Sequence, residues 1–263
     1  MRPFNRALYS NICMRKVPGR VLPRNISVDL TPAAKRAICL WRTMLIVLRL
    51  DEDRFARSFE SFQDSPVADY VGEFDSSLEG SAVLIFKAAT ASGTTAETIL
   101  GGGAVSLASL AFKDDSSHQN TSEFIGAILV ILVLRKLGIR NPKVMLRGDS
   151  ITALTWASEE RFRGDLVTNA SIVFILLMIA TGTEIVSQHH IPGEQNWRCD
   201  GLSRPSLGKT AEDLGLSGVR LLSLTDDPDM VEILQLCDPR CSISSEDDFA
   251  SFWRRVNDVV HRV

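Results

Sequence analysis

Three strand-like segments follow one another in residues 70–112 with no helix between them, and this run limits the possible folds more than any other feature. The segments are residues 70–74, 82–87 and about 104–112, with Gly80 and the glycines at 101–103 marking turns or a bulge. Consecutive strands joined by short turns pair antiparallel, so the run predicts a three-stranded meander.

After the meander, helix-like and strand-like segments alternate. Ser122 is expected to cap an apolar helix over residues 123–137, which Gly138 ends. The further segments are a strand at 143–147, helices at 151–160 and 166–180, a strand at 184–190 and a helical segment from about residue 196. Strands separated by helices after a meander predict an α/β fold, with a mixed five-stranded sheet and helices on both faces.

The flanking regions predict helical extensions at both ends of this domain. Residues 1–67 read as a basic arm followed by a helix that begins at Thr31-Pro32, where Thr can cap and Pro can occupy the first turn. Residues 68–204 form the expected main domain. Residues 205–263 form a helical extension of unassigned role, with amphipathic segments at 229–236 and 246–260.

Charge divides the chain unevenly. Residues 1–50 contain ten Lys and Arg residues and one Asp, a net charge of +9, so the other residues carry −12 within a total of −3. A basic arm before an acidic body suggests that the arm contacts a polyanion, and we single out Arg15, Lys16, Arg20 and Arg24. A solvated tail or an Arg-rich targeting presequence would have the same composition.

Composition and cysteine usage favour an intracellular globular protein, cytoplasmic or nuclear. The longest apolar runs fall well short of the roughly 20 residues that a membrane span needs, so we expect no membrane association. No secretory signal pattern is recognisable, and the five cysteines form neither a disulfide framework nor a zinc-binding pattern.

Four acids stand at strand ends and helix starts, where neighbouring elements of a mixed sheet converge. They are Asp75 at the end of the first strand, Glu123 at the start of the long helix, Asp149 at the end of the fourth strand and Asp200 in the helix after the fifth. Clustered carboxylates repel one another unless a divalent cation is present, so the set predicts a metal site. Taken singly, each has another explanation: Glu123 and Asp149 as helix-terminal residues, Asp75 in a turn and Asp200 at the surface.

The motifs around these acids resemble those of the ribonuclease H domain of retroelement reverse transcriptases, which is related to cellular type 1 ribonuclease H. Residues 190–204, HIPGEQNWRCDGLSR, resemble the family pattern H-I-P-G-x-x-N-x-x-A-D-x-L-S-R, with Cys199 in place of the usual Ala. The sequences FDSS at 74–77, SEF at 122–124 and GDS at 148–150 resemble the other three motifs, in the family order. The resemblance covers about residues 68–204.

The resemblance implies an endonuclease that hydrolyses the RNA strand of RNA–DNA hybrids with two Mg²⁺ ions, for which Mn²⁺ could substitute. Asp75, Glu123, Asp149 and Asp200 would be the metal ligands, and His190 would assist proton transfer and product release. Asn196 and Ser150 would support the ligands. Residues 30–50 resemble, more loosely, the region that joins polymerase to ribonuclease H, which implies a polyprotein fragment and a reverse transcriptase polymerase domain as a partner.

The chain departs from the cellular enzymes in one respect. The interval 160–166 is too short for the extra basic helix that helps those enzymes hold hybrids, although Arg161 and Arg163 lie in it. Hybrid affinity would then come from the N-terminal arm or the polymerase domain. One alternative remains open: a catalytically inactive, domesticated module that binds nucleic acid or a protein. A DNA-cutting transposase or integrase of the same superfamily is disfavoured, because those enzymes usually use three acids in a different order and lack the loop that joins His190 to Asp200 here.

Overall fold

The computed structural model describes residue 38 and residues 67–88, 98–110, 112–113, 115–159, 166–241 and 246–262. The helix expected at Thr31, the arm residues Arg15, Lys16, Arg20 and Arg24, and the loop residues Arg161 and Arg163 lie outside these ranges. The sheet and the helices α4 to α8 belong to one compact unit, which also includes the chain from Arg255 onward.

The sheet has six strands in the order β5-β4-β1-β2-β3-β6. Its strands are β1 (Tyr70–Ser76), β2 (Gly80–Lys87), β3 (Thr98–Ser106), β4 (Lys143–Gly148), β5 (Glu184–His190) and β6 (Leu221–Ser223). The first three form the antiparallel meander, while β4 runs parallel to β1 and β5 runs parallel to β4. The predicted α/β class with a mixed, ribonuclease H-like sheet is confirmed, and β6 adds a strand that was not expected.

The third strand and β6 are where the strand predictions were wrong. β3 begins at Thr98 instead of residue 104, and Ala108–Leu110 form a 3-10 helix, η2. The glycines at 101–103 lie inside β3 because the backbone is crowded there: a Cβ on Gly102 would lie 2.5 Å from the Val83 carbonyl oxygen. β6 pairs in parallel with this glycine segment over only three residues, too short for a recognisable alternation.

The long helix α4 (Ser116–Lys136) begins seven residues before its predicted start. Asp115 caps it by accepting hydrogen bonds from the backbone N–H groups of Ser117 and His118. Residues 121–134 are buried around the whole helix, because α4 packs between the sheet and α6 (Thr168–Thr181). Glycines allow it to lie close to β1: a Cβ on Gly126 would lie 2.6 Å from the Phe74 ring.

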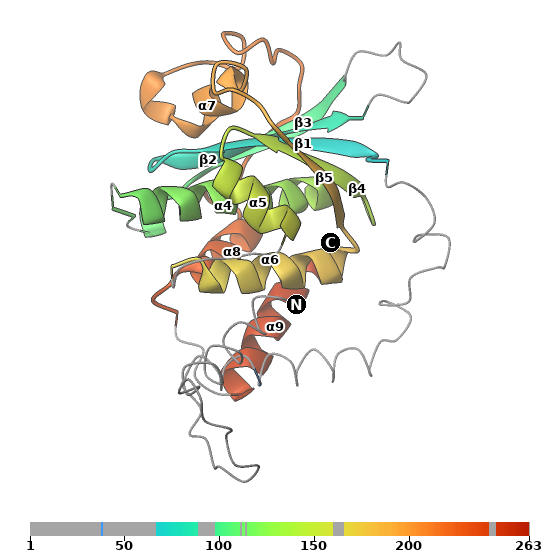
Figure 1. Ribbon diagram of the computed structural model, residues 1–263, viewed down its shortest axis with the longest axis vertical. Helices are drawn as coiled ribbons and strands as arrows, with labels where there is room; N and C mark the ends of the chain where they lie inside the picture. Colours follow the sequence, from blue (N-terminus) through green and yellow to red (C-terminus); the bar gives the residue numbers. More distant parts are fainter. Residues whose placement is uncertain are drawn as a thin grey trace, which may run out of the picture. The chain divides into compact units, whose positions relative to one another are not determined.

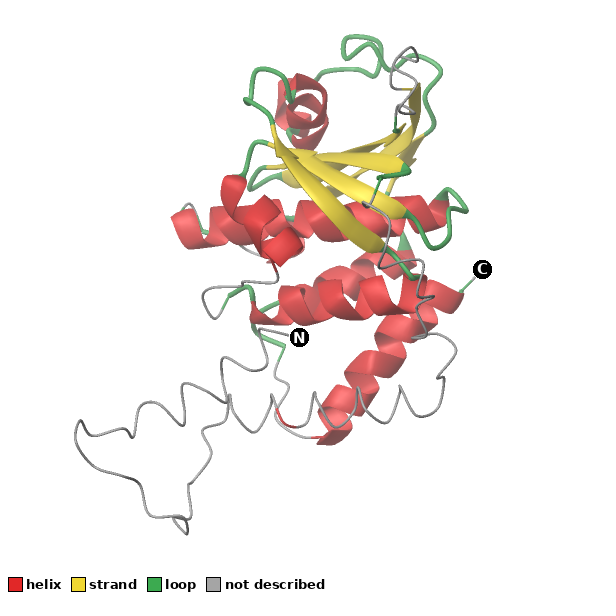
Figure 2. Cartoon of the chain, turned by 45° about the vertical axis from the view of Figure 1, so that its right-hand side comes forward, coloured by secondary structure: helices red, strands yellow, loops and turns green. Residues whose placement is uncertain are grey.

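Helices cover both faces of the sheet, as predicted (Figures 1 and 2). On one face lie α4 and α5 (Ile151–Glu159), with α6 and α8 (Pro228–Cys237) side by side further from the strands (Figure 1). On the other face lies α7 (Trp197–Ser203), followed by the 3-10 helix η3 (Pro205–Leu207). The last helix is α9 (Glu246–His261).

The second face owes part of its core to residues beyond position 204. Leu214 and Leu216 are fully buried and pack in one cluster with Leu84, Phe86 and Cys199. The segment before α8 is therefore an irregular layer over the sheet that ends in β6, and only the region from Pro228 is mainly helical. No helix within the described residues is long and apolar enough to span a membrane.

Candidate metal centre

Three carboxylates from separate elements meet at one end of the sheet. Oxygen atoms of Asp75, Glu123 and Asp149 all lie within 4.8 Å of one another. Parallel pairing accounts for two of them: Glu73 of β1 is opposite Arg147 of β4, so Asp75 and Asp149 stand side by side two residues further along. The close contact between α4 and β1 brings Glu123 to the same point.

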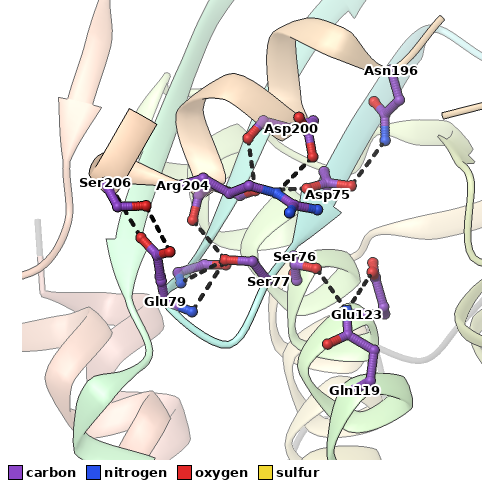
Figure 3. A network of polar contacts seen from close by, with 12 residues as sticks. Asp75, Ser76, Ser77, Glu79, Gln119, Glu123, Asn196, Asp200, Arg204 and Ser206 are labelled. Carbon is purple, nitrogen blue, oxygen red and sulfur yellow. Dashed lines mark hydrogen bonds and ion pairs between the residues drawn. The ribbon is translucent and has the colours of Figure 1, made fainter. Parts of the chain in front are cut away.

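Asp75 is the most firmly positioned of the three. It is 3% exposed, and its Oδ2 accepts a hydrogen bond of 2.6 Å from the buried Ser203 hydroxyl. The Asn196 amide donates 2.9 Å to the Phe74 carbonyl oxygen and lies 3.5 Å from Asp75 Oδ1 (Figure 3). Burial is the main reason that the pKa of Asp75 rises to about 6, and repulsion from Asp149 adds to it.

Glu123 lies in the third turn of α4, so it does not serve as a helix-terminal residue. Its Oε1 accepts 3.1 Å from the Gln119 amide, which also donates 3.0 Å to the Ser76 carbonyl oxygen (Figure 3). Its Oε2 is buried and accepts no hydrogen bond from any described residue. Burial first, then repulsion from Asp75 and Asp149, raises the pKa of Glu123 to about 9.

Asp149 follows β4 directly, and its carboxylate does not cap the next helix. Ser150 does so instead, because its Oγ accepts 3.2 Å from the Ala153 backbone N–H. Ser150 therefore supports the site by starting α5, not by contact with the acids. Asp149 Oδ1 is buried and has no hydrogen-bond donor among the described residues.

Asp200 lies outside the group of three. Its Oδ1 forms an ion pair of 2.7 Å with Arg204 Nε, one helical turn further along the chain (Figure 3). It is still close enough to raise the pKa of Asp75, while Arg204 acts in the opposite direction. The structure therefore brings three of the four expected acids together and places the fourth, Asp200, beside them in an ion pair with Arg204.

His190 lies at the exposed end of β5, next to the cluster. Its Nε2 is 3.1 Å from the Asp149 carbonyl oxygen, to which it donates. Gly193 lies in the turn that follows, and a Cβ there would approach Asp149 Oδ2 to 3.2 Å. The segment 190–196 thus brings an exposed imidazole to Asp149 and the buried Asn196 to Asp75.

Cys199, the departure from the family pattern, occupies a fully buried core position. Its Sγ donates 3.5 Å to the Glu73 carbonyl oxygen. Burial raises the pKa of its thiol, which keeps it protonated and unreactive. Cysteine therefore replaces the small family residue as a packing group and leaves the carboxylates undisturbed.

The donor set fits a hard divalent cation. All of the converging atoms are carboxylate oxygens, the ligands that Mg²⁺ and Mn²⁺ favour, and the three carboxylates include two buried oxygens that have no donor within the described residues. The raised pKa values show how the cluster exists without a cation, since Glu123 then keeps a proton at neutral pH. Cation binding would displace that proton.

Gln119, Ser203 and Arg204 are contacts that the sequence analysis missed. Ser203 and Arg204 end the quoted 190–204 motif, so their position was a usable signal. The signal for Gln119 was weaker: it precedes Glu123 by four residues and shares its helix face only if the helix begins well before residue 123.

The fold and the site together define an α/β protein of ribonuclease H-like architecture with a buried carboxylate cluster. The sequence matches no family model and no curated protein. Among solved structures, ribonuclease H1 from the halophilic archaeon Halobacterium salinarum NRC-1 is similar over 54% of this chain and 97% of its own, with 19% identity and a TM-score of 0.35. The fold assignment therefore rests on the strand order and helix layers of this chain.

Proposed function

We propose that this chain is a metal-dependent nuclease that hydrolyses the RNA strand of RNA–DNA hybrids. One observation carries the proposal: three carboxylates from three elements converge within 4.8 Å, and two of their buried oxygens accept no hydrogen bond from the described residues. Such an arrangement is costly for folding unless a cation or protons neutralise it. Functional sites are where such costs are commonly found.

The proposed metal ligands are Asp75, Glu123 and Asp149, with Asp200 as the fourth. The proposed cofactor is a pair of Mg²⁺ ions, for which Mn²⁺ could substitute. Divalent cations at such a site neutralise the charge that develops as a phosphodiester is hydrolysed. Asp75 is held by Ser203 and Asn196, so its orientation does not depend on the ligand. Asp200 would join the other acids once its pair with Arg204 opens.

His190 is the proposed proton carrier. Its imidazole is exposed and is tied to the Asp149 main chain, so it can exchange protons with solvent while it stays beside the cluster. The substrate class rests on the resemblance of residues 190–204 and of the three shorter motifs to the ribonuclease H pattern. We propose in addition that the N-terminal arm contributes to hybrid affinity and that a reverse transcriptase polymerase domain is a partner of the chain.

The direct test is incubation of the purified chain with an RNA–DNA hybrid labelled on either strand, with Mg²⁺, with Mn²⁺ and with EDTA. We expect cleavage of the RNA strand only, dependent on the cation, with duplex DNA and single-stranded RNA left intact. Cleavage of duplex DNA at the same rate would instead support a transposase-like enzyme. Hybrid binding without cleavage under any cation would support the inactive module.

A further inference from the structure

A second site with the opposite charge lies at the other end of α4. A cavity of about 280 Å³ opens where the C-terminal end of α4 meets the start of α8 and the end of α9. The residues that line it are Leu132, Arg135, Lys136, Gly138, Arg140, Asp229, Val259, Val260 and Arg262. Four of these side chains are cationic and one is anionic, and Leu132, Val259 and Val260 provide an apolar surface.

Two of the cations are balanced by acids. Lys136 Nζ lies 2.8 Å from Asp227 Oδ2 and 3.1 Å from Asp229 Oδ2. Arg262 is 3.6 Å from Asp229 Oδ1. Asp229 is therefore held between Lys136 and Arg262, and no carboxylate of the described residues forms an ion pair with the other two cations of the cavity.

Arg135 and Arg140 are those two cations. Arg135 donates from both Nε, at 2.8 Å, and Nη2 to the Val260 carbonyl oxygen, and no described carboxylate forms an ion pair with its guanidinium. Arg140 is exposed and forms no hydrogen bond or ion pair with any described residue. Burial first, then repulsion from Arg140, lowers the pKa of Arg135, while Asp229 acts in the opposite direction, so Arg135 and Arg140 are close enough to interact.

Helix termination explains only part of this basic group. Cations near a helix C-terminus offset its partial negative charge, and Arg135 does so for α9 through Val260. The end of α4, however, is closed by its own backbone: Gly138 N–H donates to the Arg135 carbonyl oxygen and Ile139 N–H to that of Leu134. Arg140 therefore has no role in ending the helix.

We infer that this cavity binds a phosphate monoester dianion through Arg135 and Arg140. The charge matches, because four cations against Asp227 and Asp229 leave an excess of two. The guanidinium of Arg140, which is unpaired among the described residues, can bind phosphate oxygens with paired hydrogen bonds, while Arg135 adds a fixed positive charge. The cavity is larger than a phosphate group alone, and its apolar wall provides space for the ester group.

This site is separate from the carboxylate cluster. Arg135 follows Glu123 by twelve residues of continuous helix, which corresponds to about 18 Å at 1.5 Å per residue. Binding at the cavity can therefore be measured without Mg²⁺ and without hydrolysis. The inference stands or fails independently of the proposed nuclease activity.

The test is calorimetric titration of the full chain, in EDTA at constant ionic strength, with inorganic phosphate, with adenosine monophosphate and with adenosine. We expect saturable binding of both phosphates and none of adenosine. Tighter binding of the nucleotide would identify an ester as the ligand, and equal affinity would identify the phosphate group alone. Binding of adenosine as tight as that of its monophosphate would overturn the inference.

Arg140→Gln is the decisive variant because its side chain is exposed and unpaired among the described residues, so the fold should not depend on it. We expect its phosphate dissociation constant to rise about tenfold, as for the loss of one charge-assisted hydrogen bond. Arg220→Gln, at another exposed position, is the control with the same charge change and should bind as the unmodified chain does. The phosphate affinity of Arg140→Lys should lie between the affinities of these two variants. Equal affinity in Arg140→Gln and Arg220→Gln would show that the cavity does not bind phosphate.

Discussion

The two ends of α4 carry opposite unbalanced charges, and they differ in how that charge can be removed. At one end, the pKa of Glu123 is raised to about 9, so a proton neutralises it at physiological pH, and the pKa of Asp75 is raised to about 6, so it takes up a proton just below neutral pH. At the other end, Arg135 and Arg140 are arginines, which do not lose their protons in this range. Protons or a cation can therefore balance the charge of the acidic end, whereas only an anion can balance that of the basic end.

This difference predicts that the acidic end responds to pH and to divalent cations. The basic end should respond to anions alone. The charge on a cluster of carboxylates is adjustable, which suits a site that must bind and release a metal. The charge on a pair of guanidinium groups is constant, which suits recognition of a fixed anion.

The largest expected effect is loss of hydrolysis when the acidic cluster is broken. Asp149→Asn keeps the size of the side chain but removes a charged ligand, and we expect the rate of hybrid cleavage to fall by at least about a thousandfold. Asp75→Asn should behave in the same way. Without metal, both variants should be as stable as the unmodified chain or more so, because a clustered charge is removed. Asp226→Asn, an exposed acid elsewhere, is the matched control and should retain full activity. Activity within tenfold of the control would contradict the assignment.

The second effect concerns stability without metal. Asp75 and Glu123 bind protons more tightly in the folded chain, with pKa values of about 6 and about 9, than at their ordinary values of 3.8 and 4.5. Their contribution to the free energy of unfolding is therefore complete below about pH 4, and it is lost as the pH rises through 6 and then 9. Between pH 5 and pH 8 we expect the free energy of unfolding to fall by on the order of 5 kcal/mol, most of it from Glu123.

Urea unfolding in EDTA at both pH values measures this loss. Glu123→Gln should remove most of the pH dependence, because its side chain cannot titrate. Mg²⁺ should restore stability to the unmodified chain at pH 8 and do little for Glu123→Gln. A stability that rises from pH 5 to pH 8 in EDTA would show that the cluster is not protonated as described.

The third effect tests how Glu123 is positioned. Gln119→Ala removes the amide that joins Glu123 Oε1 to the Ser76 carbonyl oxygen. We expect Mg²⁺ affinity, measured from the cation dependence of stability and of cleavage, to fall by about 10-fold to 100-fold. Gln188→Ala, on the exposed part of β5, is the control for loss of an amide. Equal affinities in the two variants would mean that α4 alone fixes the position of Glu123.

Sequence patterns predicted the sheet well wherever strands alternate with helices or end in a motif. β5 has the predicted bounds, and α5 and α6 lie within two residues of theirs. The start of α4 could not be predicted from periodicity because residues 116–120 are all polar and none of them is buried, so only the Asp115 cap marks them. β6 was not predictable because three residues have too little pattern.

In the site, too, some features could be predicted from the sequence and others could not. The positions of the acids at strand ends indicated that Asp75 and Asp149 would be neighbours, since parallel strands place their carboxyl ends at one edge of a sheet. The contacts that hold them depend on segments far apart in the chain, such as Ser203 with Asp75. Local sequence contains no information on such distances, so these contacts required the fold.

The smallest expected effect concerns Asp200, the acid that stands apart from the other three. Its pair with Arg204 is partly exposed, with side chains 34% and 47% accessible, and such pairs contribute less than about 1 kcal/mol. If Asp200 joins the cation site when that pair opens, Arg204→Gln should tighten Mg²⁺ binding by no more than about fivefold, since the competing cation is gone. Arg220→Gln controls for the change in net charge. Tightening in Arg204→Gln alone would assign Asp200 to the metal site, whereas weaker binding would mean that Arg204 supports the cluster by holding Asp200 in place.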